Sequence, residues 1–214
     1  MNSRHYTPQD NLIGQFDTAL RTLFGRPQTT ERSNPSETAP EQVLAEAARD
    51  EAARLMRINH TGEVCAQALY QGQALTARLD TVRERMERAA REENDHLAWC
   101  EQRVQELGSH TSLLNPVFYT GSFAIGAIAG AIGDQWSLGF VAETEKQVIE
   151  HLDEHLQRLD EQDQRSRAIL EQMKIDEARH GNTALEAGGA PLPQPVRRLM
   201  KLTSEIMTGS VYWI

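Results

Sequence analysis

Hydrophobic positions recur at intervals of three and four residues over most of this chain, which is the spacing of one face of an α-helix. A composition rich in Ala, Glu and Leu and poor in aromatic residues also favours helix over sheet. We therefore expect an all-α fold. The pattern predicts a short amphipathic helix at residues 9–25, longer helices at residues 40–78, 80–108, 117–162 and 163–187, and a last amphipathic helix at residues 196–213.

Two segments interrupt the helical pattern. Residues 26–40 are rich in Pro, Ser and Thr and predict an exposed, flexible linker. A turn is expected at Asn115-Pro116, because proline disfavours helix at the residue before it. The chain is therefore divided into an N-terminal amphipathic segment with its linker, residues 1–40, and one larger helical domain, residues 41–214.

The helix predicted at residues 117–162 has two unlike halves. Residues 117–141 contain a single charged residue, Asp134, whereas the second half is strongly charged. The apolar half has the length and hydrophobicity of a membrane span, but a span would place the two halves of one bundle on opposite sides of a membrane. We expect it to stay in the bundle and touch lipid or a lipid-like ligand, with Gly126 and Gly130 permitting close helix packing. Whether it enters the bilayer or lines a lipid-binding channel stays open.

Charge and cysteine content exclude several classes of protein. The net charge of −9 argues against a nucleic-acid binder, although the two ends of the chain are mildly basic. Cys65 and Cys100 form no CxxC motif or zinc-finger spacing, so a reducing compartment is expected. The first ten residues lack the apolar core of a secretory signal, which predicts a location in the cytoplasm or on the cytoplasmic side of a membrane.

Two histidines each follow a glutamate by three residues inside a predicted helix. These pairs are Glu93-Asn-Asp-His96 and Glu177-Ala-Arg-His180. Residues at i and i+3 share a helix face, so each pair offers a carboxylate and an imidazole to one point. Two such pairs with two lone inward glutamates form the ligand set of a four-helix bundle that holds two metal ions. Ordinary surface Glu and His positions are the alternative interpretation.

The two lone glutamates must come from the other two long helices. Glu63 is the candidate in the first of them, and Glu143, Glu145 and Glu150 are the candidates beyond the apolar run. Oxygen and imidazole donors without thiolate suit iron or manganese better than a soft metal.

Other acidic residues lie next to the two Glu/His pairs. Glu92 and Asp95 should turn away from the face of Glu93 and His96, because each residue rotates a helix by about 100°. Asp95 and Asp176 are candidates for accepting a hydrogen bond from a ligating imidazole.

Four stretches then resemble one known family, the demethoxyubiquinone hydroxylases of ubiquinone biosynthesis. They occur in the order and at the separations of that family, over about residues 40–214, and the bacterial forms with Trp136-Ser-Leu-Gly-Phe140 look closest. The four stretches are Arg57-Ile-Asn-His-Thr-Gly-Glu63, Glu93-Asn-Asp-His96, Val141-Ala-Glu-Thr-Glu145 and Asp176-Glu-Ala-Arg-His180.

The resemblance implies a ferritin-like bundle with a di-iron centre. Its two iron ions would activate dioxygen to hydroxylate the ring of a polyprenyl demethoxyubiquinol, with Glu93 and Glu177 as bridging ligands. His151 matches a family histidine expected to assist substrate or electron transfer, whereas His60 and His155 are expected to be structural. The implied metal ligands are Glu63, Glu93, His96, Glu145, Glu177 and His180.

The expected partners follow from this substrate and from the apolar segments. The apolar half at residues 117–141 and the last helix, with Arg197, Arg198 and Lys201 near its start, predict peripheral attachment to the cytoplasmic side of the cell membrane. Other ubiquinone-biosynthesis proteins are further candidate partners, and a homo-oligomer is left open. The alternative functions are a ferritin-like iron oxidase or store, a metal-free helical scaffold, and a transfer-RNA hydroxylase, which the acidic charge disfavours.

Overall fold

The computed structural model describes residues 8–25, 28–30 and 32–214, and within them every regular element is helical. The prediction of an all-α fold is confirmed. The elements are α1 (Pro8–Phe24), the 3-10 helix η1 (Pro35–Thr38), α2 (Glu46–Thr76), α3 (Asp80–Glu106), α4 (Asn115–Ile132), α5 (Asp134–Arg158), α6 (Gln164–Glu186) and α7 (Gln194–Val211).

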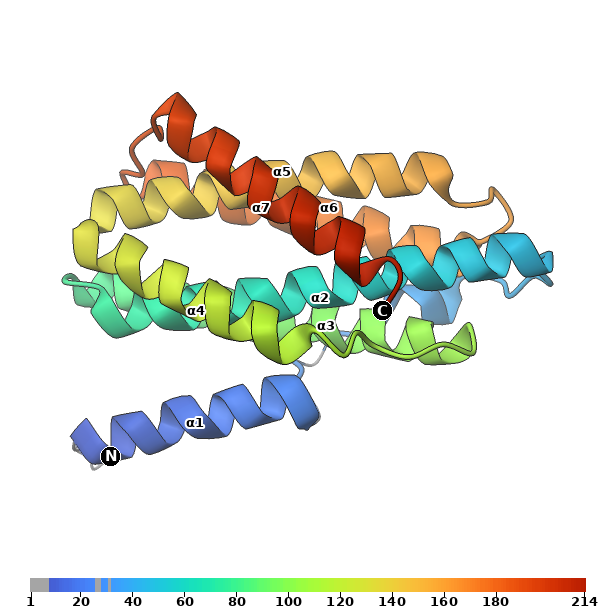
Figure 1. Ribbon diagram of the computed structural model, residues 1–214, viewed down its shortest axis with the longest axis horizontal. Coiled ribbons are helices and arrows are strands. Elements are labelled where there is room, and N and C mark those ends of the chain that lie inside the picture. The colour runs from blue at the N-terminus through green and yellow to red at the C-terminus, as the bar shows by residue number, and fades with distance from the viewer. Residues whose placement is uncertain (1–7, 26–27, 31) are drawn as a thin grey trace.

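Two helical hairpins make up the bundle. Helix α2 packs along α3, and α5 packs along α6 (Figure 1). Helix α4 lies along α2, α7 crosses diagonally over the front of the bundle, and α1 lies along one side, where it contacts α2 and α4 (Figure 1). The four predicted ligand-bearing segments therefore become α2, α3, α5 and α6, and α4 is an additional helix.

Glycines bring α2 and α4 together. A Cβ atom built on Gly126 would lie 2.3 Å from the backbone oxygen of Leu69, and one on Gly72 would lie 2.3 Å from that of Phe123. Only residues without a side chain fit at such a crossing. Gly126 thus packs a helix of the bundle, as the sequence predicted.

Three predicted boundaries are wrong. The segment predicted as one helix at residues 117–162 is broken at Gly133, whose φ of 146° favours glycine. Asn115 begins a helix instead of a turn, because Pro116 sits in the first turn, where the missing N–H costs no hydrogen bond. The first long helix begins at Glu46, six residues later than predicted.

Part of the predicted linker is packed against the bundle. Asn34 and Ser36 are buried, and the Asn34 side chain caps η1 by accepting a hydrogen bond from the Ser36 backbone N–H. Asn34 also donates to Gln102 of α3, and η1 contacts α6. The prediction of an exposed linker is therefore wrong for these residues.

Among the described residues the hydrophobic core forms three clusters, and two of them are layers on either side of a polar centre. One layer contains Leu55 and Met56 of α2 with Trp99 and Cys100 of α3 and Met173 of α6. The other is built around residues such as Tyr70, Met86, Leu138, Val141 and Ala184. Because α2 and α3 run antiparallel, both pass from one layer to the other through the middle of the bundle. Polar side chains placed there are shielded on both sides.

No helix in the part of the chain that the structure describes combines the length and hydrophobicity needed to cross a bilayer. The break at Gly133 leaves α4 as an 18-residue helix. Several of its apolar side chains are nevertheless exposed, among them Val117, Ile128 and Ile132.

Candidate metal centre

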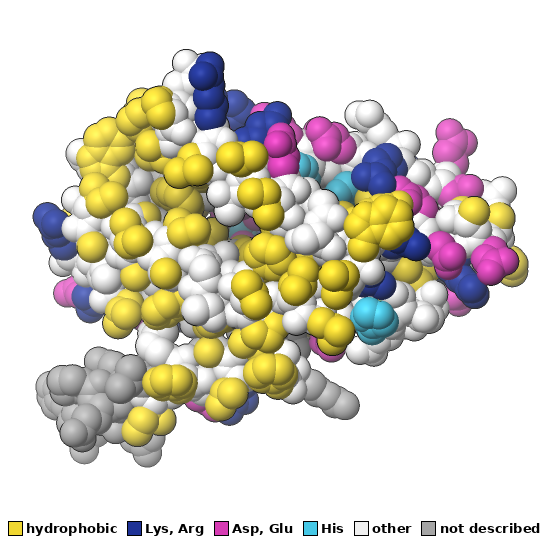
Figure 2. Space-filling model, viewed as in Figure 1, with side chains coloured by type: hydrophobic (Ala, Val, Ile, Leu, Met, Phe, Trp, Pro, Cys, Tyr) yellow, Lys and Arg dark blue, Asp and Glu magenta, His cyan; other side chains and the backbone are white. Residues whose placement is uncertain are grey.

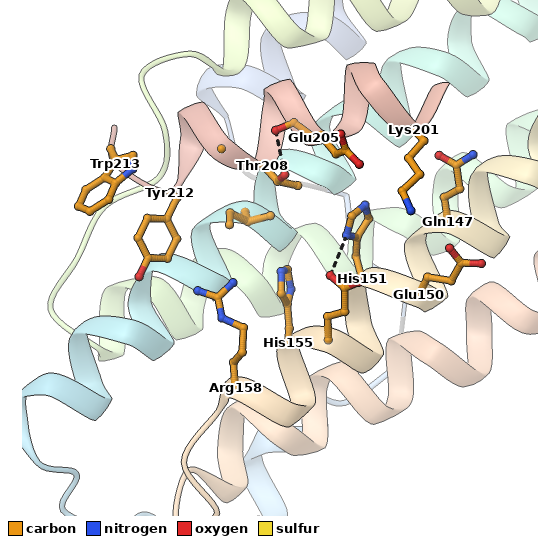
Figure 3. A pocket seen from close by; sticks show the side chains of 13 residues that line it. Gln147, Glu150, His151, His155, Arg158, Lys201, Glu205, Thr208, Tyr212 and Trp213 are labelled. Carbon is orange, nitrogen blue, oxygen red and sulfur yellow. Dashed lines mark hydrogen bonds and ion pairs between the residues drawn. The ribbon is translucent and has the colours of Figure 1, made fainter. Parts of the chain in front are cut away.

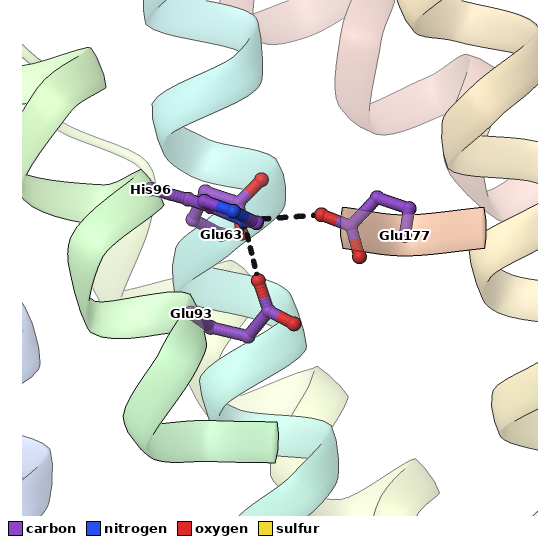
Figure 4. Close-up of side chains that lie close together, drawn as sticks. All are labelled: Glu63, Glu93, His96 and Glu177. Carbon is purple, nitrogen blue, oxygen red and sulfur yellow. Dashed lines mark ion pairs between the residues drawn. The ribbon is translucent and has the colours of Figure 1, made fainter. Parts of the chain in front are cut away.

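Four of the predicted ligands converge in the middle of the bundle. Glu63 of α2, Glu93 and His96 of α3 and Glu177 of α6 are all buried, and one ligand atom from each lies within 4.8 Å of the others (Figure 4). The Nδ1 atom of His96 lies 2.7 Å from Glu93 Oε2, 3.1 Å from Glu177 Oε1 and 3.8 Å from Glu63 Oε2.

A second group forms beside the first and shares two of its members. Glu93, Glu145, Glu177 and His180 also offer ligand atoms within 4.8 Å of one another. His180 Nδ1 lies 2.8 Å from Glu93 Oε1 and 3.3 Å from Glu177 Oε2. Glu93 and Glu177 therefore turn one oxygen toward His96 and the other toward His180. This is the arrangement that two bridging carboxylates require.

Among the three candidate glutamates on α5, only Glu145 reaches this cluster. Glu143 pairs with Arg197 at 3.1 Å, and Glu150 is largely exposed and lies 3.9 Å from Lys146. All six residues implied as ligands by the resemblance are brought together.

The outer nitrogen of each histidine is held by another carboxylate. His96 Nε2 lies 3.0 Å from Asp176 Oδ2, and His180 Nε2 lies 2.8 Å from Glu92 Oε2. With Nε2–H donating outward, the Nδ1 lone pair of each imidazole points at the cluster, which is the tautomer that a metal ligand needs. Asp176 therefore accepts the hydrogen bond predicted for it. Glu92 turns away from the face of Glu93 and His96, as predicted, but it reaches the outer nitrogen of His180, which the sequence did not indicate.

Asp95 differs from its prediction. Both of its oxygens accept hydrogen bonds from Thr30, from the backbone N–H at 2.7 Å and from the hydroxyl at 2.6 Å. It thus contacts the N-terminal segment and not an imidazole. No signal in the sequence pointed to this partnership, because Thr30 lies 65 residues away and inside the predicted linker.

The cluster has excess negative charge that protons compensate. Burial raises the pKa of Glu63 to about 8, and burial with repulsion from Glu177 and Glu93 raises the pKa of Glu145 well above its usual range. Burial opposes the charged form of His180, but hydrogen bonds and charge from Glu177 and Glu93 outweigh it and raise its pKa to about 12. Cations bound here would replace these protons.

The residues present fit a metal ion. Both carboxylate oxygens of Glu93 and the Nδ1 atom of His96 are buried and have no hydrogen-bond partner of acceptable geometry. Buried polar atoms without partners are costly, yet these atoms face the two groups of potential ligands. Cations held by the two groups would satisfy all of them.

Tyr70 belongs to the site although it is not one of the predicted residues. Its buried hydroxyl donates a hydrogen bond to Glu145, and it also lines a cavity of about 450 Å³ together with Glu92 and His180. The available signal was its position seven residues after Glu63, which places both on one face of α2.

His151 lies outside the cluster but near it. Its Nε2 atom is 3.0 Å from Ser204 Oγ of α7, and it projects into a cavity of about 370 Å³ between α5 and α7 (Figure 3). A smaller cavity of about 60 Å³ is lined by His151 and also by Glu63, Glu145 and Glu177. His151 therefore stands between the cluster and α7.

His60 and His155 make other contacts. His155 Nδ1 lies 2.9 Å from Asn59 Oδ1, and His60 Nδ1 lies 3.5 Å from Asn115 Nδ2. Burial lowers the pKa of His60 to about 4 and that of His155 to about 3, so both stay neutral at pH 7. Neither belongs to the carboxylate cluster.

The profile of the family described as ubiquinone biosynthesis protein COQ7 matches residues 50–210. Similar proteins named 3-demethoxyubiquinol 3-hydroxylase include those of Nitrosococcus oceani, 60% identical over 100% of both chains, and Azotobacter vinelandii, 60% identical over 100% of this chain and 99% of the relative. That of Chromohalobacter salexigens is 58% identical over 98% of this chain and 99% of the relative.

Proposed function

Because the chain belongs to the COQ7 family of ubiquinone biosynthesis proteins, we propose that it is a di-iron monooxygenase that hydroxylates the ring of a polyprenyl demethoxyubiquinol. The observation that carries this proposal is the pair of four-residue groups that share Glu93 and Glu177. The hydroxylases of similar sequence support the substrate class.

In this proposal six side chains hold two iron ions. Glu63 and His96 would hold one iron, Glu145 and His180 would hold the other, and Glu93 and Glu177, which belong to both groups, would serve both. When bound, the iron pair supplies the activation of dioxygen. The chain supplies the ligands at fixed positions, and Asp176 and Glu92 orient the two imidazoles. The two apolar layers of the core exclude bulk water from the centre.

The quinol would approach from the side of α7. The small cavity beside Glu63, Glu145 and Glu177 is lined on the α7 side by Ser204 and Met207. Its volume of about 60 Å³ leaves room for only one or two waters, so a ring entering here requires α7 to shift. We assign to His151 the handling of a substrate proton or hydroxyl, because its imidazole borders both this cavity and the larger one next to it.

An apolar face suits attachment to a membrane. We use that name for the exposed apolar side chains of α1, α4 and α7, which gather on one side of the molecule (Figure 2). A polyprenyl chain costs about 0.8 kcal/mol for each methylene brought into water, so the enzyme must meet its substrate at the bilayer. The apolar face comprises Ile13, Phe16, Leu20, Phe24, Val117, Ile125, Ile128, Ile132, Val196, Leu199, Leu202 and Ile206.

The function is tested by metal analysis and product analysis of the purified chain. We expect two irons per chain. When a two-electron reductant is supplied, we expect a demethoxyubiquinol to gain one oxygen atom from labelled dioxygen, and the other oxygen atom to leave as water. Product oxygen drawn from water would contradict the proposal. Iron bound without any quinol turnover would instead favour an iron oxidase or store.

Glu177→Ala provides the matched test of the ligands. We expect it to lose metal and hydroxylation together, because removing one bridging carboxylate affects both groups. Glu150→Ala, at an exposed glutamate on α5 outside the cluster, is the control and should retain both. Full iron content and normal turnover in Glu177→Ala would exclude this ligand set.

A further inference from the structure

The N-terminal segment around Thr30 and Arg32 reaches the outer edge of the metal centre on one side only. Arg32 donates from NH2 to Asp176 Oδ2, the same oxygen that lies 3.0 Å from His96 Nε2. Arg32 and Asp176 are 144 positions apart in the sequence. The contact therefore joins a segment that precedes the bundle to the carboxylate that orients a candidate metal ligand.

Three neighbours fix the Arg32 guanidinium in place. Its carbon Cζ lies 5.0 Å from the centroid of the buried Trp99 ring, which is within the range of a cation–π contact. Its NH1 atom lies 3.8 Å from Asp95 Oδ2, and its NH2 atom binds Asp176. The side chain is only 32% exposed, so these contacts are partly shielded from water.

Thr30 donates hydrogen bonds to the second carboxylate near Arg32, that of Asp95. Asp95 is fully buried, and the hydrogen bonds that it accepts within the described residues come from Thr30. A buried carboxylate without such donors is strongly destabilised. Asp95 lies one residue before His96 on α3. The N-terminal segment therefore contacts α3, which carries His96, and also Asp176 on α6, which accepts from His96.

The other half of the centre lacks this support. His180 Nε2 is oriented by Glu92, which is partly exposed and is contacted by Arg179 at 2.9 Å. Arg179 also reaches Asp176 at 3.1 Å, but it is itself 55% exposed. Among the described residues, the N-terminal segment therefore contacts the carboxylate that accepts from His96 and not the one that accepts from His180, while Gln172 and Arg179 also donate to Asp176.

We propose that Arg32, assisted by Thr30, is a positioning residue that fixes His96 for the metal ion in the group with Glu63. The proposal rests on the metal centre described under the proposed function. Arg32 holds Asp176 in the orientation that accepts Nε2–H, and this keeps the Nδ1 lone pair of His96 aimed at the metal. Partners of this kind typically change metal affinity by about 10- to 100-fold.

The test is titration of the metal-free full-length chain with Mn²⁺, which has no need of dioxygen or quinol. We expect the wild type to bind two ions. Arg32→Ala should bind one of them about tenfold more weakly and leave the other unchanged. Arg32→Lys keeps the charge without the planar fork and should fall between them. Arg21→Ala, at an exposed arginine of α1, is the matched control and should behave as wild type.

A second pair of variants separates positioning from folding. Thr30→Val loses the hydroxyl that donates to Asp95, whereas Thr30→Ser keeps it. We expect Thr30→Val to lower the affinity for the same Mn²⁺ ion that Arg32→Ala affects. Thr30→Ser should keep the wild-type affinity for that ion. A structural role alone would lower the free energy of unfolding of Arg32→Ala and leave both Mn²⁺ affinities unchanged, which would overturn the proposal. Equal weakening of both ions would overturn it too.

These outcomes are distinct from failure of the metal centre itself. If the wild type binds fewer than two Mn²⁺ ions, the ligand assignment and the positioning role both fall. If it binds two ions and Arg32→Ala binds both with wild-type affinity, only the positioning role falls.

Discussion

His180 Nε2 of α6 lies 2.8 Å from Glu92 Oε2 of α3, although the neighbouring Glu93 also points at the same imidazole from its Nδ1 side. Two consecutive glutamates on α3 therefore hold opposite nitrogens of one histidine. His180 lies where α6 approaches α3, so its ring bridges side chains that leave α3 in different directions. Glu93 faces the metal groups, and Glu92 holds the ring from outside.

We predict that Glu92→Ala lowers the affinity for one of the two Mn²⁺ ions by about tenfold, because His180 loses the carboxylate that fixes its tautomer. The affected ion is the one near Glu145, whereas Arg32→Ala affects the other. Glu92→Gln keeps an acceptor oxygen and should lose less. Glu87→Ala, an exposed position on the same helix, is the control. Unchanged affinity in Glu92→Ala would show that this contact is dispensable.

The close crossing of α2 and α4 gives a matched pair of glycines. Gly126→Ala places a Cβ 2.3 Å from the Leu69 backbone oxygen, and we expect it to destabilise the fold by about 1–3 kcal/mol. Gly121→Ala, in the same helix, meets nothing within 4 Å and should stabilise by about 0.5–1 kcal/mol through helix propensity. Denaturant unfolding measures both. A stabilised Gly126→Ala would contradict the crossing.

Stability of the metal-free chain should fall as the pH rises from about 6.5 to 8. Glu63 has a pKa of about 8 in the folded chain and about 4.3 when unfolded, so the folded state binds more protons in this window. His180, with a folded pKa of about 12, stays protonated while the unfolded histidine, with a pKa of about 6.5, loses its proton. Each group lowers the free energy of unfolding by up to about 1.4 kcal/mol per pH unit.

Bound Mn²⁺ should remove this dependence, because the metal displaces the protons. Denaturant unfolding at several pH values, with and without Mn²⁺, measures the effect, and Glu63→Gln should flatten the metal-free slope. A metal-free stability that rises with pH across this window would contradict the protonation of the cluster.

The ligands on α3 and α6 could be predicted from the sequence because each pair is local. Glu93 with His96, and Glu177 with His180, need only the i to i+3 geometry of a helix. The choice of Glu145 over Glu143 and Glu150 was also within reach, because Leu138, Val141, Glu145 and Leu152 follow one another at helical spacing and are all buried. The family resemblance implies the same residue.

The outer contacts could not be predicted, because they depend on tertiary packing. Nothing local in Thr30 or Arg32 indicates that they meet Asp95 and Asp176, 65 and 144 positions away. A polar segment rich in Ser and Thr has the sequence pattern of a linker, whether or not its N–H and O–H groups donate to buried carboxylates in the folded chain. The break at Gly133 was hidden for a related reason, since glycine in an apolar run is equally consistent with close helix packing.

Two of the three basic residues in the predicted membrane anchor are exposed. Arg197, one of three basic residues near the start of α7, lies 3.1 Å from Glu143, whereas Arg198 and Lys201 are exposed. We expect the wild type to float with vesicles that contain anionic lipid. The double variant Arg198→Glu and Lys201→Glu should bind at least about tenfold more weakly, since each basic residue near such a surface contributes about 1 kcal/mol.

Two comparisons separate charge from apolar contact in this flotation experiment. Arg85→Glu with Arg88→Glu reverses two exposed arginines on α3 and, as the matched control, should float like the wild type. Ile128→Asn with Leu202→Asn places polar groups on the apolar face and should weaken binding to anionic and neutral vesicles alike. If both double reversals weaken flotation equally, the basic residues of α7 act only through net charge. A wild type that stays with the aqueous fraction would exclude the membrane surface as a partner.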